Sequence, residues 1–183
     1  MGKIPVGLQL YSVRHDCERY LAAVLDKVAA VGYQGVEFAG YYGRGAEDLR
    51  KMLDDRGLRC CGAHTQLAEV QDDRLQATIE FALALGNPYL VVPGLPADWR
   101  DSRDAWLRTA EFFNTLAEKL KPHGLRTGYH NHAVEFQPLD GELPWDIFAQ
   151  NTSPDVILQL DTGNCLHGGG DPVEMLRRYP GRA

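Results

Sequence analysis

The stretch VGLQLYSVRHD (residues 6–16) distinguishes between two α/β architectures. Residues 6–13 predict a first strand that opens after Pro5, and polar residues follow it. An open doubly wound sheet usually carries a glycine-rich turn directly after its first strand, whereas residues 8–16 contain no glycine. A barrel instead collects polar residues at the ends of nearly all of its strands. The stretch therefore favours a (β/α)8 TIM barrel.

The same alternation of short β-rich runs and amphipathic stretches continues along the chain. Strands are predicted at residues 6–13, 35–39, 58–64, 89–93, 125–132 and 156–161. Helices are predicted at residues 19–31, 46–56, 73–85, 145–150, from 101 or 102 to 121, and from 172 onward. Strands that are each followed by a helix predict parallel pairing through right-handed crossovers.

Residues 1–183 are expected to form one barrel domain that lacks its last two βα units. A closed barrel needs eight units and about 250 residues, and only about six units are predicted here. An open six-stranded sheet would expose two apolar edges, which natural proteins avoid. We therefore expect either that the protein continues or that a partner chain, such as a second copy in a homo-oligomer, completes the sheet.

Composition restricts the function classes. The 183 residues are 44% hydrophobic and 24% charged, as in an ordinary globular domain. A net charge of −6, with acidic and basic residues mixed, argues against nucleic-acid binding. The absence of an apolar run of about eighteen residues argues against a membrane span. The N-terminus carries no signal-like region, so a cytoplasmic location is expected.

Polar side chains stand at the predicted strand ends, and period-two alternation assigns them to faces. Three pairs share a face: Gln9 with Tyr11, His130 with His132, and Gln159 with Asp161. Glu37 and His64 close the second and third strands. If these faces point into the barrel, the two acids and three histidines of this set meet at one mouth.

A divalent metal site is predicted from the fifth and sixth strands. His130 and His132 lie two residues apart, and two imidazoles on one strand face are a recurrent metal geometry. Asp161 follows the apolar run 156–160, where burying a carboxylate is costly unless a cation or donors receive it. The alternative is that these residues are hydrogen-bonded structural groups.

Other polar and aromatic residues are candidates for substrate contact or proton transfer. Glu135, three residues after His132, is a candidate general base or further metal ligand. Glu37 and His64 either act on substrate or serve as a loop cap and a core histidine. Trp99 could stack on the apolar face of a sugar, or it could pack a loop onto a helix.

Five motifs resemble the sugar-phosphate isomerase/epimerase group of the xylose-isomerase-like barrel superfamily. They span the chain: GLQLYSVR (7–14), GVEFAGYYG (35–43), GYHNHAVEF (128–136), LQLDTGN (158–164) and DPVEMLRRYPGRA (171–183). The resemblance implies one divalent ion (Mn, Zn, Co or Mg) held by residues that end strands five to eight. Asp161 matches the strand-six aspartate, and His130 stands where strand five commonly supplies a glutamate. Counterparts of the strand-seven histidine and strand-eight glutamate are not found within residues 1–183.

The resemblance also implies a reaction. A metal-dependent isomerase or epimerase would act through an enediolate on a keto-sugar or cyclitol, and a lyase or dehydratase is equally compatible. Proton transfer would fall to Glu135, His132 and Glu37, and substrate contacts to the residues His64, Gln9, Tyr11 and Trp99. The alternative is a non-catalytic, truncated barrel that binds sugar or a partner chain. An endonuclease-IV-like activity is disfavoured, because the fourth predicted strand ends without a histidine and the chain is acidic.

Overall fold

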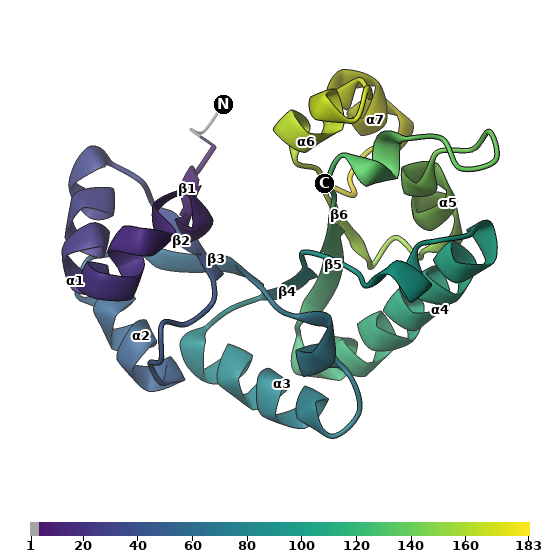
Figure 1. The fold of residues 1–183 in the computed structure, drawn as a ribbon. Coiled ribbons are helices and arrows are strands. Elements are labelled where there is room, and N and C mark those ends of the chain that lie inside the picture. The colour runs from purple at the N-terminus through teal and green to yellow at the C-terminus, as the bar shows by residue number, and fades with distance from the viewer. Residues whose placement is uncertain (1–3) are drawn as a thin grey trace. The chain divides into compact units, whose positions relative to one another are not determined.

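The computed structural model describes residues 4–183, which form two compact units divided between Leu90 and Val91 (Figure 1). The strands are β1 (Gly7–Gln9), β2 (Gly35–Ala39), β3 (Arg59–His64), β4 (Tyr89–Val92), β5 (Arg126–His130) and β6 (Ile157–Gln159). The α-helices are α1 (Arg14–Val31), α2 (Ala46–Asp54), α3 (Arg74–Leu85), α4 (Arg103–Leu120), α5 (Pro144–Asn151), α6 (Thr162–His167) and α7 (Pro172–Arg178). Short 3₁₀ helices are η1 (Leu10–Val13), η2 (Leu67–Val70), η3 (Ala97–Trp99), η4 (Lys121–His123) and η5 (Val134–Phe136).

The strand order follows the chain order from β1 to β6. The pairs β1–β2, β2–β3 and β5–β6 are parallel. A doubly wound sheet would reverse its strand order at a switch point, whereas a barrel adds strands in sequence. The order therefore confirms the predicted (β/α)-barrel fold, of which residues 4–183 contain six strands.

The core of the first unit lies between β2 and β3 and the helices α1 and α2. Its buried side chains include Leu25 and Val28 from α1, Phe38 from β2, and Leu49 and Leu53 from α2. Gly32 ends α1 with φ 101°, a left-handed conformation that side chains other than glycine rarely adopt. The predicted apolar faces of both helices are thus the faces that pack on the strands.

The first strand is shorter than predicted, and the first helix begins earlier. Strand β1 ends at Gln9 because the side-chain oxygen of Gln9 accepts a hydrogen bond from Tyr11 N (3.0 Å) and starts η1. Helix α1 then begins at Arg14, with non-helical dihedral angles at Tyr20. The regular helix predicted at residues 19–31 corresponds to the part of α1 around and after this kink.

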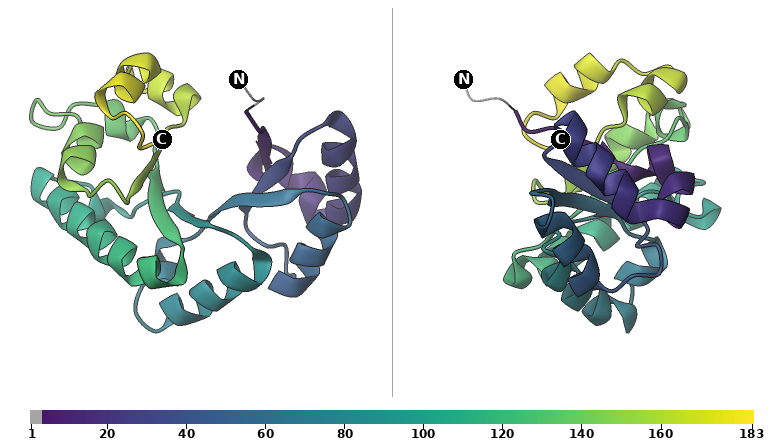
Figure 2. Two further views of the ribbon diagram at one scale, coloured as in Figure 1. Left: turned by 180° about the vertical axis from the view of Figure 1, so that it is seen from behind. Right: turned by 90° about the vertical axis from the view of Figure 1, so that its left-hand side faces the viewer.

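The second unit has an aromatic core between α4, α5 and β5. Trp106 and Phe113 from α4 pack around Tyr129 of β5 and Phe148 of α5, with ring centroids 5.1–6.2 Å apart. Such edge-to-face contacts add to the free energy gained from burial. The left view of Figure 2 shows α4 alongside β5 from behind. Helix α4 begins at the predicted Ser102 cap, whose hydroxyl accepts from Ala105 N.

The longest helices, α1 and α4, have 18 residues each and carry charged side chains along their exposed faces. Within residues 4–183, no helix is both long and apolar enough to cross a membrane.

We expect the stability of this fold to fall at alkaline pH. Burial raises the pKa of the Cys60 thiol from 9.0 to about 12 and the pKa of the Tyr41 phenol from 10.0 to about 12. Above pH 9 the unfolded chain therefore loses protons that the folded chain keeps, and the free energy of unfolding decreases by up to about 1.4 kcal/mol per pH unit for each group.

Urea unfolding followed by circular dichroism between pH 8 and 12 measures this slope. The Cys60→Ala/Tyr41→Phe double variant should show a flatter dependence on pH. An equal slope in the variant and the parent would show that these two groups do not cause the loss.

Candidate active site

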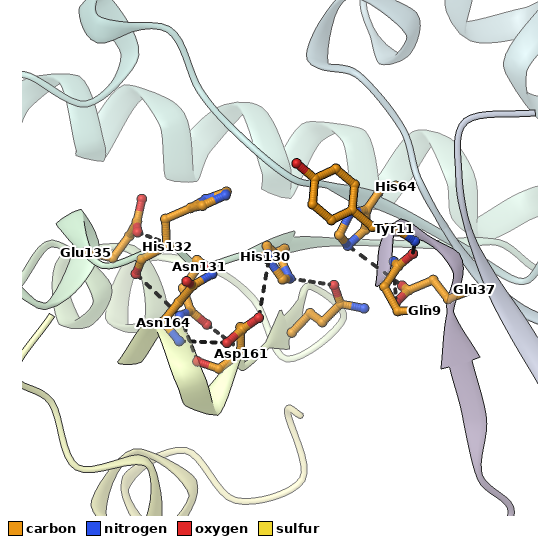
Figure 3. A network of polar contacts seen from close by, with 11 residues as sticks. Gln9, Tyr11, Glu37, His64, His130, Asn131, His132, Glu135, Asp161 and Asn164 are labelled. Atoms are coloured by element: carbon orange, nitrogen blue, oxygen red, sulfur yellow. Dashed lines mark hydrogen bonds and ion pairs between the residues drawn. The ribbon is translucent and has the colours of Figure 1, made fainter. Parts of the chain in front are cut away.

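In the first unit, three polar side chains from consecutive strands, Gln9, Glu37 and His64, lie together (Figure 3). Gln9 Nε2 donates to Glu37 Oε2 at 2.9 Å, and His64 Nε2 lies 4.0 Å from Glu37 Oε1. The side chains of His64 and Glu37 are only 12% and 15% exposed. A partly buried carboxylate in the middle of β2 and an imidazole at the end of β3 thus lie together, which is a suitable pair for binding a hydroxyl or moving a proton.

A β-bulge in β3 brings His64 to the face that carries Glu37. Val36 is paired with Cys60, but the next residue, Glu37, is paired with Gly62, so that Cys61 has no partner on β2. In this register His64 is opposite Ala39, two residues after Glu37 and on the same face. Regular pairing would have placed His64 on the other face, because a shift of one residue reverses every side chain.

Gly62 also gives the Glu37 carboxylate its space. A Cβ atom on Gly62 would lie 3.0 Å from Glu37 Oε1. Only a residue without a side chain leaves this carboxylate undisturbed, so glycine in the bulge serves the cluster as well as the strand.

Tyr11 lies beside this cluster but not in the predicted way. Because β1 ends at Gln9, Tyr11 belongs to η1, and the expectation that Gln9 and Tyr11 share a strand face is wrong. The Tyr11 side chain is 57% exposed, and the Arg14 guanidinium lies over its ring, 4.2 Å from the centroid. Gln9 accepts from Tyr11 N and donates to Glu37, so it links the backbone of Tyr11 to the carboxylate.

In the second unit, His130, Gln159 and Asp161 form a further cluster. The β5–β6 register pairs His130 with Gln159, and His130 Nδ1 lies 2.9 Å from Gln159 Oε1. Because a carboxamide oxygen only accepts, His130 donates from Nδ1, and in the neutral imidazole Nε2 carries the lone pair. Nε2 lies 3.9 Å from Asp161 Oδ2, and Figure 3 draws this contact as a dashed line. An imidazole nitrogen and a carboxylate oxygen, both atoms of the kind that bind metal ions, therefore face each other at this distance.

Two residues predicted to continue these strands lie beyond them. Strand β5 ends at His130, so His132 is in the following loop, exposed, with its ring 5.3 Å from that of His130. Strand β6 ends at Gln159, and Asp161 caps α6 through Oδ1, which accepts from Asn164 N (2.7 Å). The expected shared strand faces are corrected accordingly, since both residues take their positions from loop and cap geometry.

His130 Nε2 and Asp161 Oδ2 are suitable atoms for binding a divalent ion, but they are few in number. Imidazole nitrogen and carboxylate oxygen suit zinc, manganese or cobalt. Among residues 4–183, however, no three histidine, cysteine, aspartate or glutamate side chains are grouped closely enough to hold a metal. His130 and Asp161 thus offer at most two candidate ligand atoms, and a metal ion bound there would need further ligands, for example from water or substrate.

A model of the xylose isomerase-like TIM barrel family matches residues 25–182. The chain belongs to this family. Crystal structures agree: a sugar phosphate isomerase/epimerase from Parabacteroides distasonis ATCC 8503 superposes with a TM-score of 0.82 at 30% identity, covering 100% of this chain and 73% of that one. A structure of L-ribulose 3-epimerase (TM-score 0.66, 19% identity, 98% of this chain and 68% of that one) shares the fold.

Curated relatives of this xylose isomerase-like chain include inosose dehydratases. The protein from Clostridium botulinum (strain Alaska E43 / Type E3) is 23% identical over 88% of this chain and 60% of its own length. The protein from Geobacillus kaustophilus (strain HTA426) is 25% identical over 87% of this chain and 58% of its own length. The chain thus spans about 60% of the length of these relatives.

Glu135 lies inside this xylose isomerase-like barrel chain rather than at its surface. It is 1% exposed, Tyr129 Oη donates to Oε1 (2.6 Å), and His132 N donates to Oε2 (2.7 Å). Burial, followed by the neighbouring Glu135, raises the pKa of Tyr129 well above 10.0. Both carboxylate oxygens are therefore engaged in holding the loop after β5, and no described contact turns Glu135 toward Asp161.

Trp99 lies in η3 and packs on α4. Its ring meets Phe112 edge-to-face at 5.1 Å, and its carbonyl oxygen accepts from Thr109 Oγ1 (2.7 Å). These contacts favour the packing interpretation of Trp99 over sugar stacking.

Three residues of the second cluster were not predicted as site residues. Gln159 orients His130, and Asn131 and Asn164 hydrogen-bond to Asp161. All three belong to the HNH and LQLDTGN segments, so their proximity to His130 and Asp161 in the sequence was the available signal.

Proposed function

We propose that this chain carries part of the active site of a metal-dependent isomerase, epimerase or dehydratase acting on a keto-sugar or cyclitol. The observation that carries the proposal is the facing pair His130 Nε2 and Asp161 Oδ2, with Gln159 directing the imidazole lone pair. The inosose dehydratases and the sugar phosphate isomerase/epimerase among the relatives support the substrate class.

In this proposal His130 and Asp161 bind one Mn, Zn, Co or Mg ion. When bound, the ion supplies Lewis-acid stabilisation of the negative charge that develops on a substrate oxygen. Gln159 keeps His130 in the tautomer that can coordinate. Asn164 N occupies Asp161 Oδ1, which leaves Oδ2 for the ion.

The cluster of the first unit is a separate candidate for polar chemistry. Glu37 is the candidate acid or base, since it is partly exposed and accepts from Gln9. His64, beside Glu37, and the exposed Tyr11 are candidates for binding substrate hydroxyls and the apolar face of the ring. In the second unit His132, exposed next to His130, is a second candidate for proton transfer.

Isomerisation, epimerisation and dehydration of such substrates share one step, the removal of a proton from a carbon next to a carbonyl group. Incubation of the protein in D₂O with MnCl₂ and either an inosose or ketohexoses should place deuterium at that carbon, detected by ¹H NMR. The final product then distinguishes the classes: an aldose, a deuterated epimer, or an unsaturated ketone formed by loss of water.

Two variants make the experiment specific. Asp161→Asn should abolish deuterium incorporation, whereas Asp171→Asn, at the equivalent cap of α7, should retain it. If neither the parent protein nor Asp171→Asn exchanges any substrate proton, the catalytic proposal fails. A chain that only binds sugar or a partner would then be favoured.

A further inference from the structure

The side chain of Asn131 makes two hydrogen bonds to the backbone of Asp161. Asp161 N donates to Asn131 Oδ1 at 2.7 Å, and Asn131 Nδ2 donates to Asp161 O at 3.1 Å. Asn131 is completely buried, although it lies between the part-exposed His130 and the exposed His132. Figure 3 shows this contact directly below the His130 ring, between the ends of β5 and β6.

This contact extends the β5–β6 ladder beyond its last strand pair, His130–Gln159. A carboxamide carries the same donor and acceptor as a peptide group, so Asn131 substitutes for a strand residue that the loop does not provide. Without it, Asp161 N and Asp161 O would lack this partner at the point where β6 turns into α6.

Asn164 completes the arrangement. Its side-chain Nδ2 donates to Asn131 O (3.2 Å), and its backbone N donates to Asp161 Oδ1 (2.7 Å). The backbone and one carboxylate oxygen of Asp161 are therefore both fixed. The other oxygen, Oδ2, is the one that faces His130 Nε2 at 3.9 Å.

We propose that Asn131 is a positioning residue that sets the place of Asp161 Oδ2 and thereby the affinity for the metal ion. This role rests on the metal site of the proposed function. Outer partners of metal ligands typically change metal affinity by about 10- to 100-fold when they are removed. Asn131 acts through the Asp161 backbone, so its effect is on geometry and not on charge.

Asn114 provides a matched control in the same unit. Ser153 N donates to Asn114 Oδ1 (2.7 Å), and Asn114 Nδ2 donates to Asn151 O (2.9 Å). Asn114 thus makes the same two kinds of bond to backbone groups, but between α4 and the end of α5. A loss of metal affinity caused by reduced stability alone would appear in both alanine variants.

The test uses Asn131→Ala, Asn114→Ala and the parent protein. Titration with MnCl₂, followed by paramagnetic broadening of the Asp161 and Asn164 amide signals in NMR, gives the concentration for half-maximal binding. Asn131→Ala should raise this concentration by about 10-fold or more, and Asn114→Ala by less than about twofold. Hydrogen exchange at the Asp161 amide should accelerate at least about tenfold in Asn131→Ala only.

Each of the other outcomes would contradict a specific step of the proposal. Unchanged Mn²⁺ affinity with faster exchange at Asp161 would show that the bond exists but does not position a ligand. Equal losses of affinity in the two alanine variants would show an effect of stability. Absence of Mn²⁺ binding by the parent protein would overturn the metal site of the proposed function itself. Should Asn131→Ala not fold, Asn131→Gln keeps a neutral carboxamide but moves it by one methylene, and it carries the same expectation.

Discussion

The Asp161→Asn substitution is expected to remove nearly all metal binding while leaving the fold intact. The variant loses the charged oxygen that faces His130, so the affinity should fall by more than the roughly 10- to 100-fold that outer partners contribute. Asparagine also accepts well at a helix N-cap, so the bond from Asn164 N is retained and the free energy of unfolding should change by less than about 1 kcal/mol.

Elemental analysis of the purified proteins, together with urea unfolding, measures both parts of this expectation. Asp171→Asn is the matched control, because Asp171 caps α7 through the same kind of bonds, to Val173 N and Glu174 N. Metal content that is unchanged in Asp161→Asn would assign Asp161 to helix capping alone and would return His130 to a structural role.

Glu135→Ala should cause the largest loss of stability, about 3 kcal/mol or more. The substitution leaves the Tyr129 hydroxyl and His132 N without their acceptors in a buried region, and each such group costs about 1–3 kcal/mol. It also opens a cavity where a 1%-exposed side chain was removed. Glu142→Ala is the control, since the surface pair of Glu142 with Arg103 is half-exposed and should contribute less than about 1 kcal/mol.

A second variant separates support from catalysis. Glu135→Gln keeps the volume and one acceptor, so it should unfold more easily than the parent but still exchange substrate protons. Loss of deuterium incorporation in a folded Glu135→Gln protein would instead restore Glu135 as a catalytic base. Equal stability of Glu135→Ala and the parent protein would contradict the observed burial.

The regular elements could be predicted because local pattern determines them. Strand β2 has the predicted bounds, and the caps at Ser102 and Asp171 begin α4 and α7 where the side chains allow. The barrel architecture was inferred from the missing glycine-rich turn and the polar strand ends, and the sequential strand order confirms this inference.

The departures arise from specific side-chain hydrogen bonds, which a hydrophobic pattern does not reveal. Gln9 turns its side chain back onto Tyr11 N and ends β1 four residues early. Glu135 is buried because Tyr129, six residues before it, supplies a hydroxyl partner inside the aromatic core. The sequence placed Gln9 on a strand face by alternation and made Glu135 a candidate base by its spacing after His132. Neither pattern identifies the hydrogen-bond partner that each side chain finds in the structure.

Cys61 is an extra residue in β3 that has no partner on β2, and it affects how members of this family should be aligned. The side of the sheet on which His64 stands depends on whether the number of residues before it is odd or even, and not only on its own identity. In a homologue that lacks the extra residue of this bulge, the histidine that occupies the same place in space would be expected one position earlier in the sequence. An alignment without a gap would then pair two unrelated residues, although both molecules place an imidazole at the same point in space. Functional equivalence at β3 is therefore better judged from strand register than from identity at one aligned position.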